Sequence, residues 1–191
     1  GLRIDITPMT LSWNEIKDRA LAFSREWADA VSEDAEAQSF WDQFFAVFGV
    51  TRRRVASFEA PVKKADGAGG FVDLLWKGVL LVEHESRGRN LDRAFRQALD
   101  YFPGLKERDL PRYVLVSDFA RFRLYDLDAD QIHDVALAEL YQHVRLFGFM
   151  AGYQTRSFGQ EDPVNIAAAE KLGRLHDGLK EAGYAGHALE A

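Results

Sequence analysis

The chain has 191 residues, of which 47% are hydrophobic and 28% charged, so it can bury a substantial core and its composition excludes a disordered protein. It contains no cysteine, which excludes disulfides and thiolate metal sites. The net charge of −6 argues against DNA binding over the whole surface, because nonspecific affinity comes from Lys and Arg at the phosphates. Any contact with DNA is therefore expected to be local.

No apolar run approaches the ~20 residues that a membrane helix needs, and no signal peptide is recognisable at the start of the sequence. We therefore expect a soluble, cytoplasmic protein with no membrane partner. Basic residues cluster at 52–54, 63–64 and 87–96. Each cluster is interpreted either as a local contact with DNA or as a solvated face.

The first part of the chain is predicted to be helical. Ser12 followed by Glu15 is a capping-box pattern, and apolar residues recur at helical spacing behind it, so a first helix is expected over 13–31. A second helix is expected to start near Glu33 and Asp34 and to end at Gly49. Its aromatic residues form a stripe typical of a protein core: Phe40, Trp41, Phe44, Phe45 and Phe48.

A β-hairpin is predicted in the middle of the chain. A first strand at 55–58, with Glu59 at its end and Pro61 beyond, comes before it. The hairpin itself has strands at 72–76 and 79–82 with Lys77-Gly78 between them. Carboxylates interrupt its apolar pattern, and their position decides the chemistry.

The length of the hairpin loop decides where these carboxylates point. With a two-residue loop, Asp73 pairs with Val82 and faces away from the glutamates at positions 83 and 85. With a three-residue loop over 76–78, Asp73 lies opposite Leu81 and shares one face with Glu83 and Glu85. Asp73 and Glu83 are then diagonal neighbours about 7–8 Å apart at the backbone.

A carboxylate inside a sheet costs free energy unless it is paired or binds a metal. If the three acids share a face, two of them converge closely enough to hold one small divalent ion. Otherwise Glu83 and Glu85 lie where the strand emerges into solvent and pair with Arg87 and Arg89. The spacing by itself leaves both interpretations open.

The second half of the chain predicts a crossover. Asn90 is a good cap for a helix over 91–102, on which Gln97 and Tyr101 share one face because they are four residues apart. That face either orients a carboxylate or a phosphate or simply packs on the sheet. Strands are predicted at 112–117 and 121–125, with an edge strand at 132–137 whose His133 is structural. A helix between strands favours a mixed sheet covered on both faces. Helical segments are expected over 137–149 and 164–182.

Two motifs resemble a known nuclease superfamily. Asp73, nine residues and then Glu83-His84-Glu85 resemble the D-x(n)-E-x-K core of PD-(D/E)xK nucleases, and the segment from Gln97 to Tyr101 resembles the QxxxY helix motif of their RecB-like branch. The wider stretches 82–94 and 110–125 resemble the amino-terminal nuclease domain of MmeI-like single-chain restriction-modification enzymes. In these enzymes nuclease, helical spacer, adenine methyltransferase and target-recognition domain share one polypeptide. The similarity covers residues 12–191.

This resemblance implies a restriction-endonuclease-like α/β fold, with a mixed β-sheet flanked by helices and a carboxy-terminal helical extension. Residues 1–155 would form the nuclease domain, and residues 156–191 the start of the helical spacer. The implied activity is a Mg2+- or Mn2+-dependent endonuclease that hydrolyses phosphodiester bonds in double-stranded DNA. Covalently linked methyltransferase and recognition domains are the implied partners, and S-adenosylmethionine would serve only the methyltransferase part.

The resemblance also implies the residues of the site. The implied catalytic residues are Asp73, Glu83, Glu85, Gln97 and Tyr101. The implied metal ligands are Asp73, Glu83 and the backbone carbonyl of His84, with Glu59 as a possible extra acid. Arg87 and Arg89 are the implied contacts with DNA.

The chain departs from the family at Glu85, where the family places a lysine that helps to activate the attacking water. Glutamate cannot supply the positive charge, but some restriction endonucleases of the superfamily carry it here and are active, so Glu85 would be a general base or a further metal ligand. Lys63, Lys64 and Lys77 are candidates to replace the lysine. The alternative function is a cleavage-deficient DNA-binding or architectural domain of a DNA methyltransferase. A third is an α/β interaction module with an exposed acidic strand end.

Overall fold

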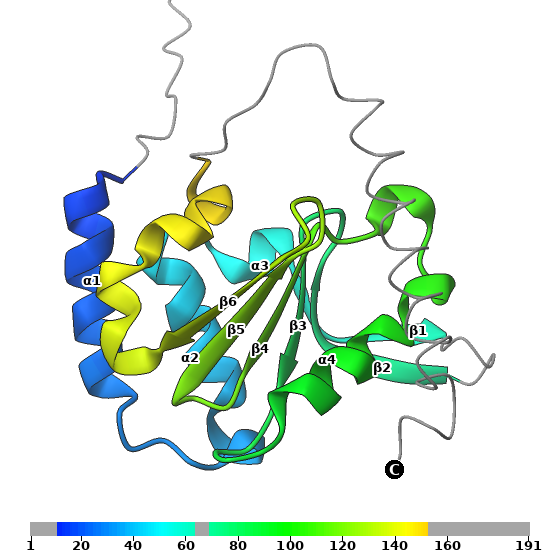
Figure 1. Ribbon diagram of the computed structural model, residues 1–191, viewed down its shortest axis with the longest axis horizontal. Coiled ribbons are helices and arrows are strands. Elements are labelled where there is room, and N and C mark those ends of the chain that lie inside the picture. Colours follow the sequence, from blue (N-terminus) through cyan, green and yellow to red (C-terminus); the bar gives the residue numbers. More distant parts are fainter. Residues whose placement is uncertain (1–10, 64–68, 153–191) are drawn as a thin grey trace, which may run out of the picture.

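The computed structural model describes residues 11–63 and 69–152, which form a six-stranded sheet with helices on both faces (Figure 1). In spatial order the strands are β1 (Ser57–Lys63), β2 (Gly69–Trp76), β3 (Leu80–His84), β4 (Tyr113–Ser117), β5 (Arg121–Asp126) and β6 (Gln131–Ala136). β3 and β4 are parallel, whereas the other neighbouring pairs are antiparallel. The predicted mixed sheet flanked by helices is confirmed.

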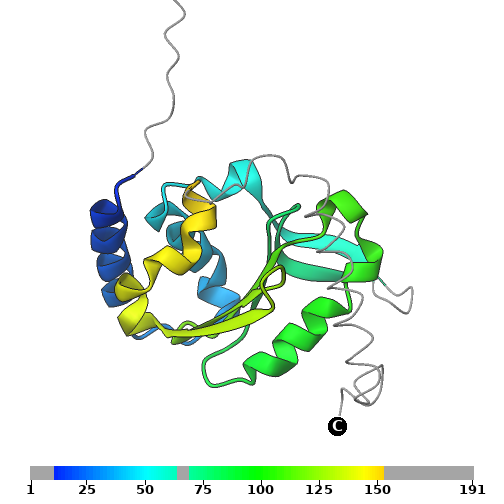
Figure 2. The ribbon, with the colours of Figure 1, turned by 45° about the horizontal axis from the view of Figure 1, so that its top comes forward.

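The sheet separates two layers of helices (Figure 2). One face is covered by α1 (Trp13–Glu26), α2 (Glu33–Val47) and the 3-10 helices η3 (Leu137–Gln142) and η4 (Val144–Ala151), and the other by α4 (Leu91–Leu99). The short helix α3 (Arg52–Val55) precedes β1, and η1 (Phe102–Gly104) and η2 (Glu107–Asp109) lie between α4 and β4. Because α4 connects two parallel strands, it is the crossover that the sequence predicts.

Each face of the sheet has its own hydrophobic core. The core under α1 and α2 is aromatic and includes the predicted stripe, in particular Phe40, Trp41, Phe44, Phe45 and Phe48. The core under α4 is mainly aliphatic and includes Leu75, Leu81, Ala94, Ala98 and Val114. Side chains alternate along β2 and β3, so these two cores identify the face to which any residue of the hairpin belongs.

The first helix begins where the capping box predicts it, because Ser12 Oγ accepts a hydrogen bond from the Glu15 N–H at 3.2 Å. It ends at Glu26, so the predicted extension to residue 31 is wrong. Trp27 leaves the helix with φ −100° and ψ 7°, and its indole N–H donates to Gln43 Oε1 on α2 at 2.8 Å. A contact with a neighbouring helix thus accompanies the end of α1.

The first strand lies further along the chain than predicted. Part of the segment 55–58 belongs to the end of α3, and β1 continues through Pro61 to Lys63. Proline lacks the N–H that a central strand needs, but β1 is an edge strand, so Pro61 can pair with Phe71 without losing a ladder bond. The prediction that the strand ends at Glu59 is therefore wrong.

The hairpin has a three-residue loop, but one residue later than predicted. Trp76 pairs with Leu80, so the loop is 77–79 and not 76–78. The Val79 N–H donates to the Trp76 carbonyl at 2.9 Å, and Gly78 has a φ of +75°, which favours glycine. The correction changes which residues are opposite one another, but not which face they share, because the register moves by two residues.

The remaining elements follow the predictions with two corrections. β4, β5 and β6 agree with the predicted strands to within a residue. The helix predicted over 91–102 ends at Leu99 and is followed by η1, and the helical segment over 137–149 consists of the 3-10 helices η3 and η4. The helix predicted over 164–182, and thus the boundary at residue 155, lies outside the described residues. Among the residues that are described, no helix has the length and apolar character needed to cross a membrane.

Candidate active site

Asp73 and Glu83 meet where β2 and β3 separate. The last pair of the ladder is Leu74 with Val82, and one step further the register places Asp73 opposite Glu83, directly and not diagonally. Asp73 Oδ2 accepts a hydrogen bond from the backbone N–H of His84 at 2.6 Å. A side chain on β2 thus binds the end of β3 where the backbone ladder has stopped.

Both carboxylates belong to the face of the sheet that α4 covers. Leu75 and Leu81 lie in the core under α4, and Asp73 and Glu83 are each two residues away from one of them. The Glu83 side chain is buried, with 8% of its surface exposed, and Asp73 is half-buried. The structure therefore has the shared face that the three-residue loop predicts.

The other two predicted acids lie on either side of this pair. Phe58 pairs with Leu74 and Ala60 with Val72, so the backbone of Glu59 on β1 lies opposite that of Asp73. Glu85 is half-buried just after β3, and its N–H donates to the Ser117 carbonyl at 2.8 Å. Among the described residues, no group of three or more Asp, Glu or His side chains is close enough to hold a metal ion. The roles of these acids as metal ligands remain predictions.

The His84 side chain points to the opposite face, as alternation predicts. Its Nδ1 accepts a hydrogen bond from the indole Nε1–H of Trp41 at 3.0 Å, and its ring centre lies 4.3 Å from that of Phe119. Burial lowers the pKa of His84 to about 4, although the charge of Asp118 opposes this shift. The imidazole is therefore neutral at pH 7 and carries its proton on Nε2, which is buried and has no hydrogen-bond partner in the described part of the chain.

Gln97 and Tyr101 differ in their surroundings. Gln97 lies on the exposed side of α4, whereas Tyr101 follows the end of the helix and is buried in the core under α4. The Tyr101 N–H donates to the Ala98 carbonyl at 3.2 Å, so the chain still turns there although the α-helix has ended. The prediction that the two residues share one face of this helix is therefore wrong, and their catalytic roles stay predictions.

Arg87 attaches the loop that follows Glu85 to the layer of helices that contains α1 and α2. Its Nε donates to the Ala30 carbonyl at 2.9 Å and its Nη2 to the Ala28 carbonyl at 2.8 Å. Both acceptors lie in the connection between α1 and α2. Arg87, predicted to contact DNA, therefore also connects the loop to the helical layer.

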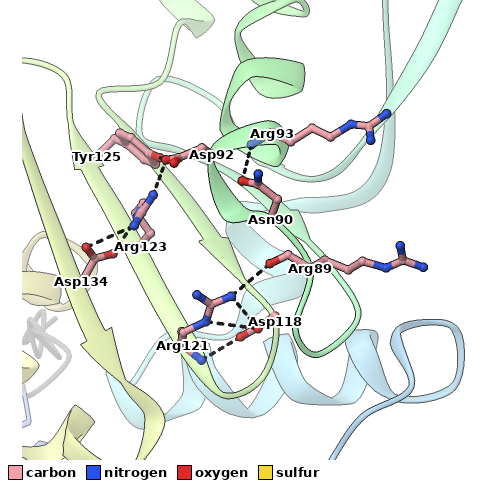
Figure 3. A network of polar contacts seen from close by, with 9 residues as sticks. All are labelled: Arg89, Asn90, Asp92, Arg93, Asp118, Arg121, Arg123, Tyr125 and Asp134. Atoms are coloured by element: carbon pink, nitrogen blue, oxygen red, sulfur yellow. Dashed lines mark hydrogen bonds and ion pairs between the residues drawn. The ribbon is translucent and has the colours of Figure 1, made fainter. Parts of the chain in front are cut away.

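Asp118, in the turn between β4 and β5, attaches the same loop from the other side (Figure 3). Its carboxylate is buried, with Oδ2 accepting from the Gly88 N–H at 3.0 Å and from Arg121 Nη2 at 3.0 Å, and Oδ1 accepting from the Arg121 N–H at 2.9 Å. Burial alone raises the pKa of Asp118, but these hydrogen bonds and the Arg121 charge outweigh it, so the pKa is lowered. Arg121 Nη2 also donates to the Arg89 carbonyl at 3.0 Å, while the Arg89 side chain projects away from this network (Figure 3).

The sequence analysis did not identify Asp118 or the residue after it. Phe119 is fully buried and has a φ of +70°, which is uncommon for a residue other than glycine. Its N–H donates to Ser117 Oγ at 3.2 Å, and its ring packs against His84 and Phe40. An aspartate between two predicted strands was the available signal for the turn, but nothing local indicates a left-handed phenylalanine.

A second polar network attaches α4 to the far strands (Figure 3). The Arg123 guanidinium on β5 forms ion pairs with Asp92 of α4 and with Asp134 of β6, the latter with Nε and Oδ1 2.7 Å apart. The Tyr125 ring stacks on Phe95 with centres 3.5 Å apart, and burial raises the pKa of Tyr125 to about 12. These contacts set the position of the amino-terminal end of α4 relative to the sheet.

Lys77 is the candidate substitute for the missing lysine whose side chain lies within the described residues, and it is not beside the acids. Lys77 lies in the hairpin loop, four residues from Asp73, which corresponds to roughly 13 Å of strand. Lys64 and the side chain of Lys63 lie outside what the structure describes. Glu85 therefore stands, among the described residues, at the position where the family places a lysine.

Comparison with known proteins identifies relatives of this chain. The family model described as "MmeI, N-terminal domain" matches residues 18–182. DNA methyltransferase A of Bacillus subtilis (strain 168) is 34% identical over 71 residues, which amount to 37% of this chain and 8% of that protein, so the chain spans a small part of this curated relative. A solved structure described as "cryoEM structure DrdV-DNA complex" is 12% identical, with a TM-score of 0.48, and the match covers 75% of this chain and 14% of that one. Because the family model matches most of the sequence, as the motifs predict, this chain belongs to the family of MmeI N-terminal domains.

Proposed function

We propose that this chain is a metal-dependent DNA endonuclease domain that hydrolyses phosphodiester bonds in double-stranded DNA, within a restriction-modification protein that also carries a methyltransferase. The observation that supports it most is the pair Asp73 and Glu83, two carboxylates opposite each other on one face of the sheet. Membership of the MmeI family supports the nuclease class. The likeness to a DNA methyltransferase supports the fusion, in which S-adenosylmethionine would serve only the methyltransferase part.

The donor groups fit Mg2+ or Mn2+. Opposed like charges in a sheet repel each other, and a divalent cation between Asp73 and Glu83 would remove this repulsion. In an extended strand the carbonyl leaves on the same side as the N–H, and the His84 N–H points to Asp73, so the His84 carbonyl is a suitable third oxygen donor. Mg2+ is commonly held by one or two carboxylates, with waters and substrate phosphate as its other ligands. When bound, the ion polarises the phosphate and lowers the pKa of a coordinated water.

The other residues of the site are proposed to act on the attacking water, to contact DNA or to support the site from the core. Glu85, two residues after Glu83, is proposed to accept the proton of the attacking water, the task of a general base. Gln97 is proposed to contact DNA from the exposed side of α4, and Tyr101 to support the site from within the core. Arg89 is proposed to contact a phosphate, because its side chain projects outward from a braced loop (Figure 3).

A plasmid-nicking assay tests this proposal. The variant Asp73→Asn removes one charge but keeps an oxygen that can accept from the His84 N–H, so the strands stay attached. Glu139→Gln is the matched control, because it removes an exposed carboxylate on η3, outside the site. With Mg2+ or Mn2+, the unchanged chain and Glu139→Gln are expected to nick supercoiled DNA equally, and Asp73→Asn to be at least about 100-fold slower. Equal nicking by Asp73→Asn and the unchanged chain excludes this site as the nuclease.

Glu85 supports a second candidate function, a DNA-binding or architectural domain without cleavage, because it replaces the positive charge that the family places there. Under this alternative the unchanged chain binds DNA but does not nick it with either metal. Glu85→Lys would then introduce nicking, because the ammonium group stabilises the developing charge on the phosphate. Under the nuclease proposal, Glu85→Gln instead slows the nicking that the unchanged chain already performs.

A further inference from the structure

We propose that Trp41 and His84 are positioning residues that hold the Asp73 carboxylate in the geometry required for metal binding and DNA cleavage. The inference rests on the proposed function for its effect on cleavage, whereas the contact that it concerns is measurable without any activity. It assigns a role to two buried residues on the face of the sheet opposite the acids.

A continuous series of hydrogen bonds connects α2 to Asp73 through β3. Trp41, with 1% of its surface exposed, donates its indole N–H to His84 Nδ1 at 3.0 Å. The backbone N–H of His84 donates to Asp73 Oδ2 at 2.6 Å. His84 therefore contacts the aromatic core with its side chain and the candidate active site with its backbone.

The end of β3 needs such support because its ladder with β2 has stopped. Val82 is the last residue of β3 that pairs with β2, and His84 lies beyond it. On the other side His84 is held by its parallel pairing with Ser117 of β4. Towards β2, the Asp73 carboxylate replaces the missing ladder bond, so any shift of the His84 backbone moves the N–H that Asp73 binds.

The aromatic core restricts the rotation of the His84 ring. Phe119 and Phe40 lie against it with ring centres 4.3 and 5.3 Å away, and Trp41 meets it edge to face at 5.7 Å. Among these neighbours the Trp41 N–H is directional, because it requires Nδ1 to face α2. Without this bond the ring keeps its packing but loses the contact that selects its orientation.

A displaced Asp73 is expected to affect cleavage strongly. Catalytic carboxylates must be held to within about 0.5 Å by surrounding residues whose own positions are fixed. A misplacement of about 1 Å costs on the order of 100-fold in rate. A residue that acts only through Asp73 should therefore alter both metal dependence and rate.

The chain contains a matched control for Trp41. Trp27 is also buried in the aromatic core, and its indole N–H also donates to a side chain of α2, Gln43, at 2.8 Å. This bond joins the segment after α1 to α2 and includes no residue of β3. Trp41→Phe and Trp27→Phe thus remove the same chemical group from the same core, but only the first removes a bond connected to Asp73.

The test uses 15N-labelled chain and two measurements on each variant: amide hydrogen exchange at residue 84, and plasmid nicking against Mg2+ concentration. For Trp41→Phe we expect exchange at least about tenfold faster and nicking at least about tenfold slower at limiting Mg2+, with Trp27→Phe within about twofold of the unchanged chain. If Trp41→Phe and Trp27→Phe give equal exchange and equal nicking, the positioning role is wrong.

Exchange and nicking separate the two proposals. If the unchanged chain does not nick DNA, the nuclease proposal fails, and exchange at residue 84 alone decides the positioning role. Should Trp41→Phe not fold, His84→Asn takes its place, because the asparagine side chain still offers an acceptor to the Trp41 N–H. Exchange at residue 84 is then expected to stay within about threefold of the unchanged chain, and an increase of tenfold or more overturns the proposal.

Discussion

Lowering the pH is expected to destabilise the folded protein through His84. Burial among Trp41, Phe40 and Phe119 lowers the pKa of this imidazole to about 4, whereas in the unfolded chain it titrates near 6.5. Between these two values the unfolded state takes up a proton that the folded state does not, so the free energy of unfolding falls as the pH falls. Well above pH 6.5 the group is neutral in both states and contributes no pH dependence.

The size of the effect follows from the two pKa values. Each pH unit between them lowers the free energy of unfolding by about 1.36 kcal/mol, so the interval from 6.5 to about 4 lowers it by about 3 kcal/mol. That is a large part of the stability of a domain of this size, which is typically about 5–15 kcal/mol. Asp118, whose pKa is lowered, loses its contribution only at still lower pH, so the two groups act in separate intervals.

Urea unfolding, followed by circular dichroism at several pH values from about 7 to about 4, measures this effect. His84→Asn is the reference, because asparagine does not titrate and every other ionisable group is retained. As the pH is lowered over this interval, the unfolding free energy of the unchanged chain is expected to fall by about 3 kcal/mol more than that of the variant. Parallel pH profiles for the two proteins would refute the claim that His84 is buried in its neutral form.

Two further predictions use pairs of matched variants. Gly78→Ala and Gly88→Ala both place a side chain at positive φ, +75° and +87°. Each substitution should lower the free energy of unfolding by about 1 kcal/mol. Gly78→Ala should lose more, because its Cβ would lie 3.2 Å from the Arg108 carbonyl oxygen whereas that of residue 88 meets open space; equal urea midpoints would contradict this. Arg87→Ala should destabilise the fold by about 1 kcal/mol through its lost hydrogen bonds. Arg89→Ala should leave stability unchanged and reduce the salt dependence of DNA binding by about one phosphate contact. If Arg89→Ala destabilises the fold and Arg87→Ala reduces the salt dependence, the structural role belongs to Arg89 and the DNA contact to Arg87.

Local signals predicted much of the fold. Ser12 and Asn90 cap the helices that they were expected to cap, because a capping side chain bonds to an N–H only three residues away. The aromatic stripe from Phe40 to Phe48 is core, because helical spacing alone collects these rings on one side. Predictions failed where a distant contact decided the outcome, as at Trp27, whose bond to Gln43 accompanies the end of the helix.

The shared face of the acids was predictable only on the condition of a three-residue loop, and the detail of the site was not predictable. Asp73 and Glu83 share a face under any three-residue loop, whichever residue begins it. Which residue lies opposite Asp73 depends on the loop, and the Asp73 contact with the His84 backbone depends on where β2 and β3 separate. The hydrogen bond between Asp118 and Gly88 joins residues 30 positions apart, and no local sequence pattern predicts it.

The amino-acid sequence by itself determined the class of fold, because hydrophobic periods and strand alternation are properties of neighbouring residues. Its motifs indicated the family. The face of the sheet on which the acids lie depended on the length of the hairpin loop, which the sequence left open between two and three residues. Only the tertiary structure decided the neutral state of His84 and its bond with Trp41, 43 positions earlier. A protonation state depends on the groups that surround a side chain in space, and a hydrogen bond depends on distances of a few tenths of an ångström. Both are set by the packing of α2 against β3, which no stretch of sequence specifies alone.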